Sequence, residues 1–206
     1  MRLLEISPVI PIAVLQDPCK AVPLARALAA GGITILEVTL RTPAALACIE
    51  RIAAEVPEVI VGAGTVTSPA QIAASVSVGA RFVVSPGTPP ELAKALYASG
   101  IPALPGCATV SEAMALRDLG FGELKLFPAE ASGGPSFLAS IFGPLPDLRF
   151  CPTGGITLDR APDYLALTNV PCVGGSWLTP STAIAEGAWD VITAGALATQ
   201  RRLIHA

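Results

Sequence analysis

A lysine stands between two leucines in the segment Glu123–Ala129, which has the period-two pattern of a β-strand. The other two lysines, Lys20 and Lys94, lie in polar stretches of helical character, where a solvated charge costs little. An ammonium group inside a parallel sheet would lose its hydration, and desolvation favours the neutral amine. A neutral amine attacks carbonyl carbons and forms Schiff bases, so Lys125 is a candidate nucleophile. The alternative is a lysine at the strand end that reaches solvent or pairs with Glu123.

A carboxylate and a guanidinium share one face of a second strand-like segment, Ile35–Arg41. Alternation of side chains puts Glu37, Thr39 and Arg41 on the face opposite three aliphatic residues. If the aliphatic face packs against helices, Glu37 can transfer protons and Arg41 can bind a substrate carboxylate with its planar guanidinium. A structural salt bridge between Glu37 and Arg41 is the alternative.

Two glycine pairs follow late strand-like segments, in Pro152–Gly155 and in Val173–Ser176. Backbone amides of such loops can cradle a phosphate, and eight-stranded parallel barrels often place a phosphate site after strands seven and eight. Both pairs could instead serve only as turns. Small residues also end earlier segments, at Thr65 and in Ser85–Gly87, where they leave room for a ligand.

Apolar segments rich in β-forming residues recur along the whole chain. The eight predicted strands are Val9–Leu15, Ile35–Leu40, Val59–Gly64, Phe82–Pro86, Pro102–Pro105, Glu123–Phe127, Leu148–Cys151 and Cys172–Gly175. The predicted helices between them include Cys19–Ala30, Pro43–Glu55, Pro69–Val78, Pro89–Ser99 and Val110–Leu119. This alternation predicts an α/β fold, a (β/α)8 TIM barrel that forms a single domain over residues 1–206. An open doubly wound sheet is the alternative, but no glycine-rich fingerprint follows the first strand.

Proline after a potential capping residue marks several of the predicted helix starts. The pairs are Asp17-Pro18, Thr42-Pro43, Ser68-Pro69 and Thr88-Pro89. Glycine follows several predicted helix ends, as the left-handed C-terminal conformation requires. These glycines are Gly31, Gly32, Gly79, Gly100 and Gly120.

Charged residues make up only 14% of the 206 residues, and hydrophobic residues make up 52%. So little charge predicts a large core and buried subunit interfaces. The net charge of −3 offers no basic surface for nucleic acid. Two uncharged stretches, Val59–Ala80 and Tyr164–Ala185, are interrupted by Gly, Pro, Ser and Thr and predict no membrane span. The first residues lack the apolar core of a signal peptide, so a cytoplasmic location is expected.

The five cysteines are odd in number, widely spaced and free of a C-x-x-C pair. They predict neither a disulfide framework nor a structural zinc site and are interpreted as small buried hydrophobic residues. The five are Cys19, Cys48, Cys107, Cys151 and Cys172. The only histidine is His205, next to the last residue, so a histidine triad, base or metal ligand is not expected.

Six segments together resemble the 2-keto-3-deoxy-6-phosphogluconate (KDPG) aldolase / 4-hydroxy-2-oxoglutarate (KHG) aldolase family. They are Leu36–Thr42, Val61–Val66, Ser85–Gly87, Leu124–Glu130, Arg149–Ile156 and Gly174–Trp177. The resemblance implies a homotrimeric barrel without a metal ion or organic cofactor, in which Lys125 forms the Schiff base and Glu37 is the general acid/base. It places the pyruvoyl end of the substrate near Arg41, Thr65, Pro86 and Phe127. It places the phosphate near Thr153, Gly154, Gly155, Gly175 and Ser176.

The sequence departs from the family pattern in two places. Leucine stands at positions 124 and 126, where many members have phenylalanine, and we expect both leucines on the side that faces the helices. Most of the usual N-terminal helical extension is also missing, which leaves open how the bottom of the barrel is closed.

The resemblance implies a class I aldolase whose partner is a small phosphorylated 2-keto acid. Its reaction would cleave KDPG to pyruvate and glyceraldehyde 3-phosphate. The galactonate epimer of KDPG and 4-hydroxy-2-oxoglutarate share the pyruvoyl half and stay open as substrates, although Thr153 and the two glycine loops favour KDPG. Outside the family, the alternatives are a phosphosugar isomerase or epimerase with Glu37 as base, and a non-catalytic sugar-phosphate-binding module. Neither alternative explains a lysine on a strand.

Overall fold

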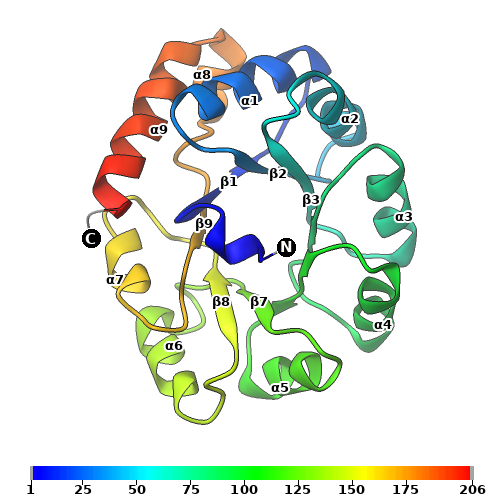
Figure 1. The fold of residues 1–206 in the computed structure, drawn as a ribbon, viewed down its shortest axis with the longest axis vertical. Coiled ribbons are helices and arrows are strands. Elements are labelled where there is room, and N and C mark those ends of the chain that lie inside the picture. Colours follow the sequence, from blue (N-terminus) through cyan, green and yellow to red (C-terminus); the bar gives the residue numbers. More distant parts are fainter. Residues whose placement is uncertain (1, 205–206) are drawn as a thin grey trace.

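Parallel strands alternate with helices in the computed structural model, which describes residues 2–204 (Figure 1). The strands are β1 (Val9–Ala13), β2 (Ile35–Thr39), β3 (Ile60–Gly64), β4 (Val83–Val84), β5 (Ala103–Leu104), β6 (Gly106–Cys107), β7 (Glu123–Leu126), β8 (Arg149–Pro152) and β9 (Val173–Gly175). The helices are α1 (Ala21–Ala30), α2 (Ala45–Glu55), α3 (Pro69–Ser77), α4 (Pro90–Ser99), α5 (Val110–Asp118), α6 (Gly134–Phe142), α7 (Ala161–Leu165), α8 (Ser181–Glu186) and α9 (Trp189–Ile204). Two 3-10 turns, η1 (Leu3–Glu5) and η2 (Pro18–Lys20), complete the order. In Figure 1 the strands lie around the centre and the helices form the outer layer.

All strand pairs are parallel, and they form two sheets within residues 2–204. One sheet has the order β5-β4-β3-β2-β1-β9, and the other has the order β6-β7-β8. The sheets meet at residues 103–107, where β5 pairs with β4 and β6 pairs with β7 on either side of Pro105. A single parallel bridge between Thr153 and Gly174 connects the end of β8 to β9. All eight predicted strands are confirmed to within two residues at each end, whereas β6 was not predicted.

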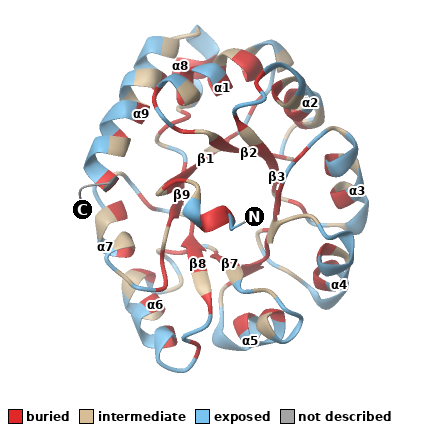
Figure 2. Cartoon of the chain, viewed as in Figure 1, coloured by how far each residue is buried: buried red, intermediate tan, exposed pale blue. Residues whose placement is uncertain are grey.

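Alternate residues of the strands divide between two apolar clusters, and the strands are largely buried (Figure 2). Leu36, Leu124 and Leu126 belong to the larger cluster, which also holds the buried residues of the helices. Leucine at positions 124 and 126 therefore lies on the helix-facing side, as expected. The smaller cluster fills the interior between the strands. Its members are Leu3, Leu4, Ile10, Ile35, Phe82, Val84, Leu104, Cys151 and Cys172.

The 3-10 turn η1 closes the end of the fold at which strands β7 and β8 begin. Leu3 and Leu4 are each only 1% exposed and pack into the central cluster. The backbone N–H of Leu3 donates to Glu123 Oε2 at 3.0 Å, and Glu5 pairs with Arg149 at 2.6 Å. Partial burial raises the pKa of Glu123. The η1 turn thus supplies the closure that the sequence left open.

Two of the four predicted helix caps are confirmed. Asp17 and Ser68 accept hydrogen bonds from backbone N–H groups two and three residues further on. The prediction is wrong for Thr42 and Thr88, because their hydroxyls donate to backbone carbonyls of distant segments and the helices begin later. Thr109, which was not predicted, forms a capping box at the start of α5.

Four of the five cysteines are buried, as predicted, whereas Cys19 is exposed, and all five are free thiols. No helix within residues 2–204 has the length and apolar character that crossing a membrane requires. The single histidine, His205, lies outside the described residues, and the cytoplasmic location stays a prediction.

The closure by η1 gives a stability prediction. Leu4→Ala should lower the free energy of unfolding by about 2–5 kcal/mol, because it leaves a cavity in the smaller cluster, which fills the interior between the strands. Leu197→Ala makes the same change on α9 at a residue that is 41% exposed, and it should cost less than about 1 kcal/mol. Urea unfolding of both variants measures the difference. Equal destabilisation would show that η1 contributes no packing energy.

Candidate active site

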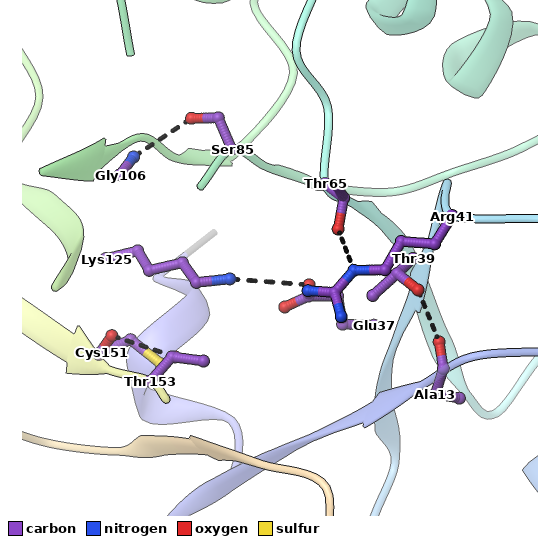
Figure 3. A network of polar contacts seen from close by, with 10 residues as sticks. All are labelled: Ala13, Glu37, Thr39, Arg41, Thr65, Ser85, Gly106, Lys125, Cys151 and Thr153. Carbon is purple, nitrogen blue, oxygen red and sulfur yellow. Dashed lines mark hydrogen bonds and ion pairs between the residues drawn. The ribbon is translucent and has the colours of Figure 1, made fainter. Parts of the chain in front are cut away.

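Lys125 on β7 and Glu37 on β2 point toward one another across the centre of the molecule (Figure 3). Lys125 Nζ lies 3.8 Å from Glu37 Oε1, and the two residues are only 5% and 3% exposed. Within residues 2–204, Glu37 Oε1 has no hydrogen-bond partner. Glu123, at the opposite end of β7, accepts its hydrogen bond from Leu3 instead. The alternative of a strand-end lysine paired with Glu123 is therefore wrong.

Glycines on the neighbouring strand β3 create the space that Glu37 occupies. A Cβ atom on Gly64 would overlap the carboxylate of Glu37, and a Cβ atom on Gly62 would overlap the ring of Phe82. Gly64 stands in register with Thr39 and Gly62 with Glu37, so both glycines line the inner face beside β2. The absence of a side chain at Gly64 leaves the space that the buried Glu37 carboxylate occupies next to Lys125.

The surroundings of the Lys125 amine are mostly apolar. Lys125 stands in register with Gly106 of β6 and Cys151 of β8, so its neighbours on both sides are small. The amine lies 5.3 Å from the centre of the Phe127 ring, a distance at which the ring face attracts a cation. Among the described residues, Glu37 is the charged group that pairs with this amine.

Arg41 and Thr65 form a second polar pair beside Glu37 (Figure 3). Arg41 Nε donates to Thr65 Oγ1 at 3.2 Å. Thr65 has a φ of 57°, a left-handed conformation that is rare for a β-branched residue and costs conformational energy. Among the described residues, the ion pair of Glu37 is with Lys125, and none joins it to Arg41. The alternative of a structural Glu37–Arg41 salt bridge is wrong.

A cavity of about 320 Å³ opens beside these residues. Its predicted lining residues are Arg41, Phe127, Thr153, Gly154, Gly155, Gly175 and Ser176. Gly174, a member of the second predicted glycine pair, also lines it, and so do Ile12, Val14 and Ile156, which were not predicted. Their positions at strand ends were the available signal, because the carboxyl ends of parallel strands form the site in this kind of fold. Pro86 does not line the cavity; its backbone lies against Gly106.

One part of the cavity lining, called the glycine rim below, consists of Thr153, Gly154, Gly155, Gly175 and Ser176. Gly154 and Gly155 have φ values of 103° and 81°, which only glycine adopts readily. A Cβ atom on Gly175 would overlap the indole of Trp177, and one on Gly174 would overlap the hydroxyl of Thr153. Side chains at these positions would be strained or would collide with their neighbours, and binding of a ligand by the two glycine pairs stays a prediction.

The arrangement combines a buried amine, a carboxylate within reach of it and a cavity that suits an anion. Arg41 is the charged residue in the cavity lining, and the glycine loops offer backbone N–H groups for a second anionic group. A lysine next to a carboxylate can form an imine with a bound carbonyl compound while the carboxylate moves protons. No group of three or more His, Cys, Asp and Glu side chains in residues 2–204 is placed to hold a metal ion.

Comparisons with known proteins agree on one family. A family model described as KDPG and KHG aldolase matches residues 1–195. The 2-dehydro-3-deoxy-phosphogluconate aldolase of Dickeya dadantii is 52% identical over 193 residues, which cover 94% of this chain and 91% of that protein. The KHG/KDPG aldolase of Escherichia coli K12 is 51% identical over 191 residues, which cover 93% of this chain and 90% of that protein.

A solved structure is similar to this chain in both fold and sequence. The KDPG aldolase from Legionella pneumophila superposes with a TM-score of 0.94 at 47% identity, and the match covers 96% of each chain. In that crystal structure, pyruvate was captured at low pH as a covalent carbinolamine intermediate. A carbinolamine is the adduct of an amine with a carbonyl carbon.

The fit between Gly64 and Glu37 gives a second stability prediction. Gly64→Ala should destabilise the fold by about 1–3 kcal/mol, because the added methyl group displaces the Glu37 carboxylate. In a Glu37→Ala background the same change should cost clearly less, since the clash is gone. Gly143→Ala is the matched control, because nothing lies within 4 Å of its Cβ position. Equal costs of Gly64→Ala in both backgrounds, measured by urea unfolding, would contradict this account of β3.

Proposed function

The chain belongs to the KDPG and KHG aldolase family, and from this premise we propose that it is a Schiff-base aldolase that cleaves KDPG to pyruvate and glyceraldehyde 3-phosphate. One observation carries the proposal: the buried amine of Lys125 lies 3.8 Å from the Glu37 carboxylate beside a cavity that suits an anion. The covalent pyruvate adduct in the Legionella relative supports the same chemistry.

The first step joins Lys125 to the substrate. The neutral amine attacks the C2 ketone carbon, and the amine proton moves to the former carbonyl oxygen to give a carbinolamine. The carbinolamine hydroxyl then takes up a proton and leaves as water, which gives a protonated imine; the same proton is released when this imine is hydrolysed at the end of the cycle. The imine accepts electrons from the neighbouring carbon, so it prepares the C3–C4 bond for cleavage.

Glu37 moves the protons of the later steps. As the C3–C4 bond breaks, its carboxylate takes the C4 hydroxyl proton, the aldehyde product forms and the bonding electrons remain as an enamine. Return of a proton to C3 regenerates the imine. Water then hydrolyses the imine, which frees pyruvate and restores the amine of Lys125. The complete cycle returns Lys125 and Glu37 to their starting states.

The remaining site residues bind the two ends of the substrate. In this proposal Arg41 holds the C1 carboxylate, and Thr65, which accepts its Nε hydrogen bond, fixes the orientation of the guanidinium. Phe127 and Pro86 lie around the pyruvoyl part, Phe127 in the cavity lining and Pro86 outside it, against Gly106. The phosphate binds the glycine rim formed by Thr153, Gly154, Gly155, Gly175 and Ser176.

We further propose that the two sheets act as one closed (β/α)8 barrel and that residues 1–206 form a single domain. The continuous segment 103–107, which pairs with a strand on each side, and the bridge between Thr153 and Gly174 support closure. The family resemblance adds a homotrimer without a metal ion or organic cofactor. The low fraction of charged residues supports buried contacts between subunits.

Chemical trapping tests the Schiff base. Borohydride with pyruvate should add the mass of a reduced pyruvate imine to Lys125 and abolish activity, because it fixes the intermediate. Lys125→Ala should give no adduct, and Glu37→Gln should lower kcat by about 10²–10⁴-fold. Lys94→Ala is the matched control, since Lys94 is a surface residue paired with Glu91, and it should behave as the parent protein. An unmodified parent protein would end the proposal.

Substrate comparison tests the assignment to KDPG. The value of kcat/KM for KDPG should exceed that for 4-hydroxy-2-oxoglutarate by at least about tenfold, because only KDPG uses the glycine rim for a phosphate. The galactonate epimer, which differs from KDPG at C4, serves as the control for stereochemistry near Glu37. Near-equal values for the three substrates would overturn the choice of one main substrate. A phosphosugar isomerase would instead leave all three uncleaved.

A further inference from the structure

Behind the glycine rim lies a polar chain that the reaction does not use directly, in which Tyr164 is buried while Glu130 and Arg160 are partly exposed. Tyr164 on α7 is fully buried, and its hydroxyl donates to Glu130 Oε1 at 2.7 Å. Arg160 Nε lies 3.8 Å from the same carboxylate oxygen. Burial, together with the neighbouring Glu130 carboxylate, raises the pKa of Tyr164, so the phenol keeps its proton and remains a donor.

Glu130 contacts the glycine rim through both its backbone and its side chain. Its N–H donates to the carbonyl of Gly154 at 3.2 Å. A Cβ atom on Gly155 would lie 2.8 Å from Glu130 Cγ, so the Glu130 side chain packs directly beneath Gly155. On its other side, a Cβ atom on Gly134 would lie 3.2 Å from the Tyr164 hydroxyl oxygen and 3.9 Å from Glu130 Oε2. The side chain is thus held between two glycines.

The contacts of Glu130 restrict the backbone of Gly154 and Gly155. Gly154 and Gly155 have no side chains, and glycine has the largest conformational freedom of any residue. The side chain of Glu130 is 35% exposed, so without its partner donors the carboxylate would turn toward water and away from the rim. Tyr164 and Arg160 hold it in place and offset part of its negative charge near the proposed phosphate.

We infer that Tyr164 is a positioning residue for the phosphate end of the substrate, acting through Glu130 on the Gly154–Gly155 rim. The inference rests on the proposed function, since that function puts a phosphate on this rim. It makes α7, which contributes nothing to the lining of the cavity, part of the binding machinery. The chemistry at Lys125 should not depend on it, because the pyruvoyl half of the substrate lies at the other side of the cavity.

Tyr164→Phe tests the inference, with Tyr97→Phe as the matched control at the other tyrosine of the chain, which is 61% exposed. Tyr164→Phe should raise KM for KDPG and weaken the binding of inorganic phosphate, titrated by calorimetry, by about tenfold each. This is the effect of one lost hydrogen bond to a charged group. The exchange of pyruvate methyl protons with deuterated water, followed by NMR, should keep its parent rate. Tyr97→Phe should change none of the three.

The outcomes separate the inference from the proposed function. Parent protein that exchanges no pyruvate protons rejects the aldolase, whereas phosphate titration still tests the positioning role. Unchanged phosphate binding in Tyr164→Phe overturns the inference, and so does an equal loss of pyruvate exchange, which marks a general structural effect. Glu130→Ala should weaken phosphate binding at least as much, Glu130→Gln should restore most of it, and Tyr164→Phe should add little to Glu130→Ala.

Discussion

Two charged side chains, Lys125 and Glu37, are held at the centre of the fold with almost no contact to solvent, and the rest of the structure depends on this pair. Removing both charges from water is costly, and their attraction alone does not offset that cost. Glu37 Oε1 even lacks a hydrogen bond within the described residues. The strands that carry the pair, β2 and β7, belong to different sheets. Only an arrangement of strands around a common centre brings the two side chains together, so packing must supply the stability.

In the packing around the centre, small residues on one strand lie next to large side chains from its neighbours. Where β3 has Gly62 and Gly64, the Phe82 ring just before β4 and the Glu37 carboxylate on β2 occupy the space. Large and small residues on adjacent strands thus complement each other, which keeps the interior dense without displacing the functional groups. The η1 turn completes this interior from below with Leu3 and Leu4. The residues that position Lys125 and Glu37 therefore also pack the core.

Periodicity predicted most of this arrangement, and contacts between distant segments explain what it missed. The alternation around Lys125 and Glu37 placed both inside, because inner and outer faces differ along each strand. The same pattern says nothing about which segment closes the bottom, so η1 was not foreseen. Thr42 and Thr88 have the local signature of caps, yet their hydroxyls bind carbonyls of segments that are distant in sequence. Local rules fail where a side chain has a better partner that is distant in the chain.

The two ends of the cavity follow different physical rules, and this bears on how its specificity can change. In the proposed mechanism the charged side chains of Lys125, Glu37 and Arg41 act directly, so a substitution among them should alter the reaction itself. At the rim, Gly154, Gly155 and Gly175 act through backbone, and a side chain at these positions meets Phe127, Glu130 or Trp177. The rim can therefore change shape mainly through the residues behind it. A contact such as Tyr164–Glu130 is then a place where recognition of the substrate tail can be altered while the Schiff-base chemistry is preserved.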